Sequence, residues 1–286
     1  ARYNGAKRNY PAAIEDIGYA IDLDGANENL WQSLLLFQLS DDRPREAMQS
    51  YRKMQTKITD PSLPVKLLFA NAAQLSDSTA TAVGTYQELL YSIDKSLTLA
   101  DTITNKNDYR HFSIDQAGLV SELYEMAGDA YFAAEPKMME DSYRCYENAL
   151  FFNPDNLLAL NNYAYFIVDT ENPATDSPRF EKAKNMSRRT VESTTSNPNG
   201  TYLDTYAWIL FKEGNYKEAL QYQKAAIEAA EEEGNPSAEL YSHYGDILFM
   251  SGEPDEAVEY WEKALGMESD NELLQRKVKN KTFYWK

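Results

Sequence analysis

The sequence predicts an all-α protein built as an α-α superhelix, a solenoid of antiparallel helix pairs, and two observations carry this prediction. Segment 203–227, LDTYAWILFKEGNYKEALQYQKAAI, is followed by a second copy at 241–265, YSHYGDILFMSGEPDEAVEYWEKAL, offset by 38 residues. Within each copy, apolar residues recur at helical spacing on both sides of a glycine. One helical hairpin cannot bury its apolar face alone, so neighbouring copies must stack.

Each copy reads as two helices joined by a short turn. Gly214 and Gly252 end the first helix, because glycine adopts the left-handed C-cap conformation without a Cβ penalty. Pro254 fits the first turn of the next helix, where no amide hydrogen is needed. Small residues let the two backbones approach closely, namely Ala207 and Ala219 in one copy and Gly245 and Ala257 in the other.

The pattern of small residue, aromatic or Leu, Gly, Ala, aromatic and Ala in WILFKEGNYKEALQYQKAAI and HYGDILFMSGEPDEAVEYWEKALGM resembles tetratricopeptide repeats. The resemblance implies one antiparallel helix pair per repeat, a right-handed superhelix and a concave face that binds peptides or partner proteins. The Tyr- and Asn-rich style of LNNYAYFIV is similar to bacterial proteins of this family, including cell-envelope lipoproteins of Bacteroidetes. That similarity favours a periplasmic or membrane-tethered location and leaves a cytoplasmic one open.

Further repeats precede these two. Segments 7–21 and 30–54 share a period of 34 residues, from Ala13 to Ala47 and from Ile17 to Tyr51. We expect helices at 63–75 and 80–100 and a repeat at 117–156. A further unit is expected at 157–191, split by the insertion 169–179. The chain should end in a capping helix at 269–281 that begins with Ser269 and Glu272 as a capping box. The first residues read as the end of one helix followed by the second helix of a repeat, so we expect the sequence to begin within a repeat.

We expect one superhelical domain over 1–286. The alternative is a division into 1–114, with divergent repeats, and 115–286, with regular repeats, because the polar stretch 101–115 is the best candidate for a boundary.

Composition narrows the partners. A formal charge of −17 and a pI near 4.6 argue against nucleic acid and against an anionic membrane surface, and allow a basic partner. The simpler interpretation of the charge is a soluble acidic surface. No apolar run is long enough to insert into a membrane in this segment. The single Cys145 allows neither an internal disulfide nor a cysteine-based zinc site.

Catalysis, metal binding and cofactor binding find little support in the sequence, and we expect no cofactor. His243 lies three residues before Asp246, a spacing that could serve a metal or a general base, but a surface hydrogen bond explains it better because no third ligand or nucleophile motif is visible. The acidic run at 22–28 faintly resembles a calcium loop, but it lacks the correctly placed Gly and Glu and fits a turn between repeats. His111 lies in the polar stretch.

The concave face is the favoured site. The resemblance assigns groove positions to the first helix of each repeat, and acidic groups beside aromatic rings there would suit a cationic ligand. The alternative is that the aromatics pack between repeats and the acids are solvated. The Lys and Asn pattern by which some members clamp a terminal carboxylate is absent. The candidate groove residues are Glu125, Asp129, Phe132, Asn161, Tyr165, Asp204, Trp208, Phe211, Ser242, Asp246 and Phe249.

These observations favour a non-catalytic scaffold that binds a peptide or partner protein. Two alternatives remain open. The chain could be the regulatory part of a larger enzyme, or it could be a structural, self-associating envelope protein, since 21 Tyr and four Trp are a heavy load of residues that favour interfaces, including those of a homo-oligomer.

Overall fold

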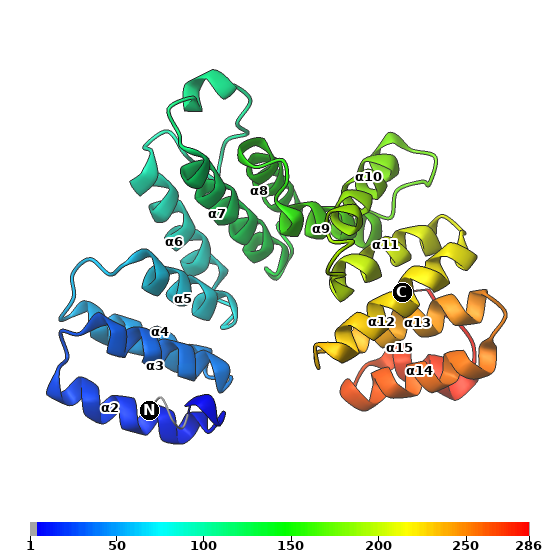
Figure 1. Cartoon of the computed structure of the whole chain (residues 1–286), viewed down its shortest axis with the longest axis horizontal. Coiled ribbons are helices and arrows are strands. Elements are labelled where there is room, and N and C mark those ends of the chain that lie inside the picture. Colours follow the sequence, from blue (N-terminus) through cyan, green and yellow to red (C-terminus); the bar gives the residue numbers. More distant parts are fainter. Residues whose placement is uncertain (1–4, 286) are drawn as a thin grey trace. The chain divides into compact units, whose positions relative to one another are not determined.

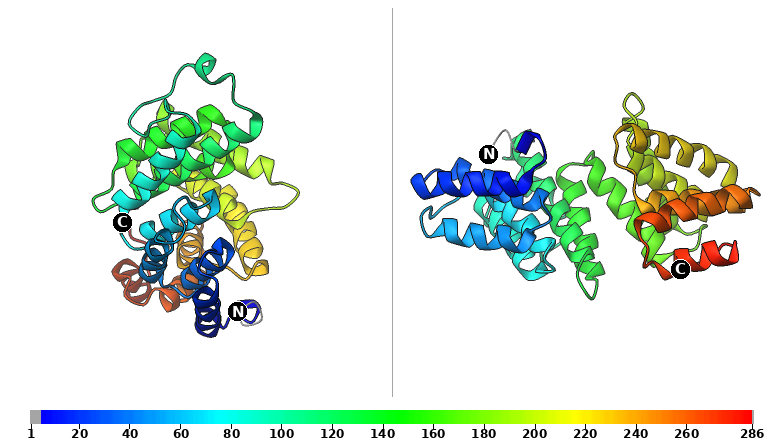
Figure 2. Two further views of the ribbon diagram at one scale, coloured as in Figure 1. Left: turned by 90° about the vertical axis from the view of Figure 1, so that its left-hand side faces the viewer. Right: turned by 90° about the horizontal axis from the view of Figure 1, so that it is seen from below.

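The protein is all-α. The computed structural model describes residues 5–285, and no strand occurs in that range. Within each of two compact units, antiparallel helices pack against one another in chain order, as Figures 1 and 2 show. The helices divide into two compact units, unit 1 (residues 1–156) and unit 2 (residues 157–286), and each is described by itself.

In its described part, unit 1 contains the helix α2 followed by three helical hairpins. The weakly patterned region 61–114 supplies a regular hairpin whose first helix packs against the preceding repeat, where Tyr51 stacks on Phe69 with ring centroids 4.1 Å apart. The helices of unit 1 are α2 (Tyr10–Leu23), α3 (Glu28–Ser40), α4 (Pro44–Gln55), α5 (Leu63–Gln74), α6 (Thr79–Ile93), α7 (Ile114–Phe132) and α8 (Met139–Phe152).

The helix expected at 80–100 ends earlier, at Ile93. Asp94 accepts hydrogen bonds from the backbone N–H and the hydroxyl of Ser96, at 2.8 and 2.7 Å, and so stabilises a turn in place of another helical turn. Leu97 and Leu99 are buried beyond this turn, and Gln87 of α6 holds their backbone because it donates to the carbonyl of Leu97 and accepts from the N–H of Leu99.

The two compact units divide after Asn156, and the stretch 101–115 lies within unit 1. The reason is that α6 packs directly against α7 and that α8 binds the intervening loop. Asn148 accepts from the N–H of Ile103 and donates to the carbonyl of Asp101, both at 2.8 Å. Arg144 donates to the carbonyl of Leu99 at 2.9 Å.

Unit 2 contains the repeats that the sequence marks most clearly. Gly214 and Gly252 take left-handed φ angles of 84° and 95° at the turns inside the two copies, as predicted. The insertion begins with the π-helical segment Ile167–Glu171 and is tied down by Arg179, which donates to both carboxylate oxygens of Glu171 at 2.6 and 3.0 Å. The α-helices are α9 (Leu157–Phe166), α10 (Pro178–Ser193), α11 (Gly200–Lys212), α12 (Tyr216–Glu232), α13 (Ala238–Met250), α14 (Pro254–Met267) and α15 (Glu272–Asn280).

The capping helix is present as α15, but its first turn differs from the expected one. Asn271 is the N-cap, and its side chain accepts from the N–H of Leu274 at 3.1 Å, so the capping box of Ser269 with Glu272 is wrong. Asparagine is as good an N-cap as serine, and it stands directly before the first helical residue. α15 packs against α14 and covers the last hairpin.

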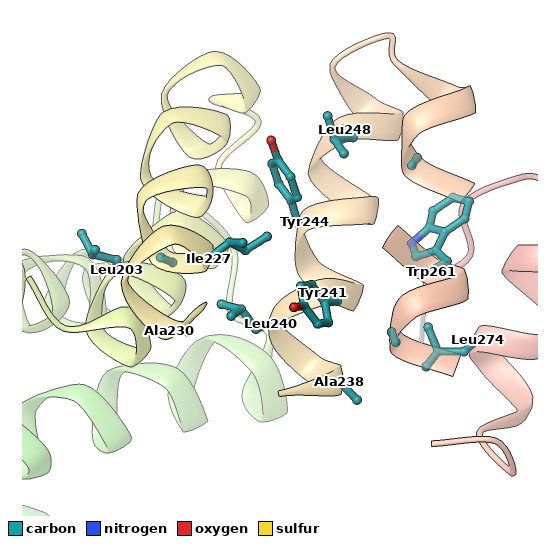
Figure 3. Close-up of a cluster of buried hydrophobic side chains, with 13 residues drawn as sticks. Leu203, Ile227, Ala230, Ala238, Leu240, Tyr241, Tyr244, Leu248, Trp261 and Leu274 are labelled. Carbon is teal, nitrogen blue, oxygen red and sulfur yellow. The ribbon is translucent and has the colours of Figure 1, made fainter. Parts of the chain in front are cut away.

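The core of unit 2 explains the small residue that recurs in the repeat. A Cβ atom on Gly245 would lie 2.5 Å from two atoms of the Trp261 indole, so only glycine lets that ring enter between α13 and α14. Figure 3 shows the surrounding cluster, in which Ile227 points from α12 toward α13. Large buried rings and close backbones therefore fix the positions of the first helices α11 and α13.

Candidate functional site

A cavity of about 520 Å³ lies in unit 2 along the first helices of its last repeats. We call it the groove. α11, α13 and α15 supply most of its lining, and the insertion after α9 closes one side. The lining residues are Asp169, Asn172, Trp208, Lys212, Ala238, Glu239, Ser242, His243, Asp246, Glu268, Asn271, Leu273, Leu274, Lys277, Phe283, Tyr284 and Trp285.

The floor of the groove is a stack of rings held by a buried carboxylate. His243 is 3% exposed, and its ring lies parallel to Trp208, with centroids 4.0 Å apart and an angle of 15°. Its Nδ1 lies 3.1 Å from both carboxylate oxygens of Asp204, which also accepts from the amide of Gln223. Gln223 in turn donates to the carbonyl of Leu240 at 3.1 Å, so α11, α12 and α13 meet at this point.

The charge of this histidine follows from its neighbours. Burial lowers the pKa of His243, but the Asp204 carboxylate, with a smaller effect from Glu239 and Asp246, more than offsets the burial and raises the pKa above the ordinary value. The expected surface pairing of His243 with Asp246 is wrong on two counts. The imidazole ring is buried. Its Nδ1 pairs with the carboxylate of Asp204 on the neighbouring helix α11, and not with Asp246 on its own helix.

A second buried pair lies beside the floor. Lys277 of α15 places its Nζ 2.7 Å from both carboxylate oxygens of Asp246, and the indole N–H of Trp261 donates to the same carboxylate at 2.8 Å. Lys277 is 2% exposed and Asp246 is 3% exposed. Burial raises the pKa of Asp246, and the ammonium of Lys277 counteracts that rise. This ion pair ties the capping helix to α13.

The charged groups around the rim of the groove are mostly negative. Glu239 and Glu268 are exposed and Asp169 is half-buried, while the ammonium of Lys212 lies 5.3 Å from the centre of the Trp208 ring. The hydroxyl of Tyr165 donates to Glu239, which holds that carboxylate at the rim. The groove therefore offers an aromatic floor with three carboxylates and one lysine around it.

The structure brings part of the predicted unit 2 residues to this cavity. Trp208, Ser242 and Asp246 line it, and Tyr165 reaches its rim. Asp204 lies one layer below, under His243. The remaining three do not line it: Asn161 is buried on α9, Phe211 packs against Phe283 and Trp285 with centroids 5.9 and 5.5 Å away, and Phe249 packs against Trp261 at 5.7 Å.

The three candidates on α7 belong to unit 1. Glu125 is 4% exposed, and burial together with the charge of Asp129 raises its pKa to about 9, so Glu125 is neutral at pH 7. Asp129 accepts from the hydroxyl of Tyr146 on α8. The Phe132 ring lies 3.8 Å below the ammonium of Lys137. These side chains are largely committed to contacts within unit 1.

Several groove residues are not among the sequence candidates. Lys277 belongs to a basic run at the end of a helix, so its position carries no groove signal. Gln223, which supports the floor from below, lies on a second helix and carries none either. The aromatic triplet at 283–285 does carry one, because three consecutive rings after a capping helix need cover. Across residues 5–285, no group of three or more His, Cys, Asp and Glu side chains is arranged to hold a metal ion, and no helix is long and apolar enough to cross a membrane.

Comparisons with known proteins agree with this architecture. The tetratricopeptide repeat family model matches residues 201–233 and 238–271. No curated protein matches the sequence. Among solved structures, a tetratricopeptide repeat protein from Parabacteroides merdae superposes with a TM-score of 0.63 at 17% identity, over 98% of this chain and 95% of that one.

Two further solved structures share the fold at low identity. The pilF protein of Pseudomonas aeruginosa has a TM-score of 0.59 at 15% identity, over 91% of this chain and 99% of that one. The Cut9–Hcn1 assembly of the APC/C has a TM-score of 0.66 at 12% identity, over 98% of this chain and 47% of that one. Residues 201–233 and 238–271 are therefore tetratricopeptide repeats, and the chain as a whole shares the superhelical fold of solved tetratricopeptide-repeat structures.

Proposed function

We propose that this protein is a non-catalytic protein-binding module and that the groove of unit 2 takes an extended segment of a partner protein. The observation that carries the proposal is the groove itself, a cavity of about 520 Å³ on the first helices of the two matched repeats. Its floor is rigid because Trp208 stacks on a histidine that three helices hold in place. A rigid floor loses little conformational freedom when a segment binds over it.

We further propose that the bound segment is basic. Asp204 and Asp246 do not supply the attraction, because His243 and Lys277 already compensate them below the surface. The attraction comes from the rim, where Asp169, Glu239 and Glu268 face one lysine. A cation that binds between these carboxylates would gain charge complementarity.

The buried His243–Asp204 pair supports a structural role over a catalytic one. Trp208 covers one face of the imidazole, and the Nδ1 atom is engaged with the carboxylate. The pair therefore orients the floor of the groove and holds α11 against α13.

The proposal is tested with a random peptide library panned against the full chain. We expect the selected peptides to carry Lys or Arg next to an aromatic residue, and their affinity to fall as salt rises. Reversing the rim charges with Asp169→Lys, Glu239→Lys and Glu268→Lys should weaken binding at least ten-fold.

The matched control reverses three exposed acids on the second helices α12 and α14, with Glu228→Lys, Glu232→Lys and Glu256→Lys. These changes alter the net charge by the same amount but lie outside the groove. If both triple variants lose affinity equally, the attraction is a property of the whole acidic chain and the groove proposal is wrong.

A further inference from the structure

One wall of the groove is formed by a short segment that follows α15. After α15 the backbone reverses at Lys281, which takes a left-handed φ of 49°, and the N–H of Thr282 donates to the carbonyl of Lys277 at 3.3 Å. Residues 282–285, which we call the return segment, then lead back from α15 to α11 (Figure 1). Phe283, Tyr284 and Trp285 all line the groove.

The return segment presents its side chains alternately, as an extended chain does. Phe283 and Trp285 both contact Phe211 of α11, and their own rings meet edge to face with centroids 4.8 Å apart and an angle of 83°. Tyr284, between them, contacts α15 instead: the guanidinium of Arg276 lies 4.6 Å from its ring centre, and its hydroxyl accepts from Asn280 at 3.0 Å. Two aromatic residues separated by one position therefore reach the same helix.

α11 receives these rings with Phe211, which lies beside the groove, and with Lys212, which lines it. The Lys212 ammonium lies 4.7 Å from the Trp285 ring centre and 5.3 Å from the Trp208 ring centre, so it is placed between the internal segment and the platform. Lys277 lies 5.5 Å from the Phe283 ring centre. The contacts of Phe283 and Trp285 are those that a bound peptide with the same spacing of aromatic residues would make.

The two ends of the return segment differ in how far their side chains are buried. Phe283 is half-buried and packs against the core of unit 2, whereas Trp285 remains 55% exposed although it rests on Phe211 and Lys212. A side chain that is more than half exposed can leave its site at low cost. The Trp285 end is therefore the part that a competing segment could displace first.

We propose that residues 282–285 are an internal occupant of the groove, and that the partner segment which displaces them carries the same pattern, two aromatic residues one position apart with a neighbouring lysine. This inference rests on the proposed function, because it names the ligand class of the same groove. Lys281, which precedes the segment, supplies the basic neighbour within the chain itself. The partner binds by replacing Trp285 and then Phe283 on α11.

The test uses a fluorescein-labelled synthetic peptide with the sequence of residues 281–285, Lys-Thr-Phe-Tyr-Trp, and fluorescence anisotropy. The full chain is compared with the variant Trp285→Ala and with the double variant Phe283→Ala, Trp285→Ala. We expect the peptide to bind the double variant at least ten times more tightly than the unaltered chain, with Trp285→Ala between the two. Tyr91→Ala is the matched control, since Tyr91 is 52% exposed and lies on α6 of unit 1, and it should behave as the unaltered chain does.

The outcomes separate this inference from the proposed function. If the peptide binds neither variant, or binds all four proteins equally, the return segment is not an occupant that competes for the groove, and the inference is overturned even if library peptides bind. If the peptide binds the double variant but no library peptide binds at the groove, the internal occupant stands and the proposed function fails. Should the double variant unfold, Trp285→Ala alone decides, because its ring is mostly exposed and its loss leaves the core intact.

Discussion

Replacing Lys277 with Met should destabilise unit 2 strongly, because it leaves a buried carboxylate without its counter-ion. Lys277 has its Nζ 2.7 Å from both oxygens of Asp246, and the two side chains are 2% and 4% exposed. In the variant, only the indole N–H of Trp261 still donates to that carboxylate, at 2.8 Å. Breaking one side of a buried ion pair costs about 3–5 kcal/mol of unfolding free energy, and we expect Lys277→Met to fall in that range.

A second substitution separates the loss of the pair from the loss of lysine packing. Asp246→Asn removes the charge and keeps an oxygen that can accept from Trp261, so the double variant Asp246→Asn, Lys277→Met should be more stable than Lys277→Met alone. The coupling free energy of the double-mutant cycle should exceed about 2 kcal/mol. Lys279→Met is the matched control on the exposed side of the same helix and should change stability by less than about 0.5 kcal/mol.

Urea unfolding followed by tryptophan fluorescence suits this measurement. Trp208, Trp261 and Trp285, three of the four tryptophans, lie in unit 2, so the signal reports mainly on the unit that is altered. A cost below about 1 kcal/mol for Lys277→Met, or a double variant no more stable than the single one, would refute the view that this pair holds α15 against α13.

Three other substitutions test the remaining contacts. Because the pKa of His243 is raised in the folded state, its contribution to stability is complete below about pH 6.5 and is lost as pH rises through the higher folded-state pKa. The urea unfolding midpoint should therefore fall between pH 6 and 9, and His243→Gln should remove this pH dependence. The pKa of Glu125 is raised to about 9, so unit 1 should lose stability as pH rises from about 4.5 toward that value. In Glu125→Gln, stability should depend less on pH and should be about 1–3 kcal/mol greater at pH 8, as measured by circular dichroism melts. Gly245→Ala should lower the free energy of unfolding in urea by at least about 1–3 kcal/mol, because the new methyl group meets the Trp261 indole. Gly266→Ala on the next helix, where a Cβ meets nothing within 4 Å, should be neutral or slightly stabilising. Equal effects of the two substitutions would contradict this explanation of the packing.

Much of the fold could be predicted because the repeat is a local pattern. Gly214 and Gly252 mark turns whose left-handed φ angles only glycine adopts freely, and Gly245 marks a close approach that the Trp261 ring requires. The ends of helices were harder to predict where side-chain hydrogen bonds determine them. Asp94 ends α6 through hydrogen bonds to Ser96 that the amphipathic pattern does not show.

The site was predictable only in outline. Family resemblance placed Trp208 and Ser242 in the groove, and both line it. It also placed Asp246 there as an open acidic group, but Lys277, 31 positions later, neutralises it. A single sequence read repeat by repeat cannot show that a side chain from one helix will neutralise a carboxylate on another, because that depends on how the last helix crosses the stack.

The most direct test of the binding groove is photo-crosslinking of a library-selected peptide. Benzoylphenylalanine is introduced at Ser242, in the groove, or at Gln221, which is exposed on the second helix α12. We predict that the peptide crosslinks at position 242 and not at 221. Equal crosslinking at both positions, or crosslinking at 221 alone, would contradict the claim that the groove is where this protein binds its partner.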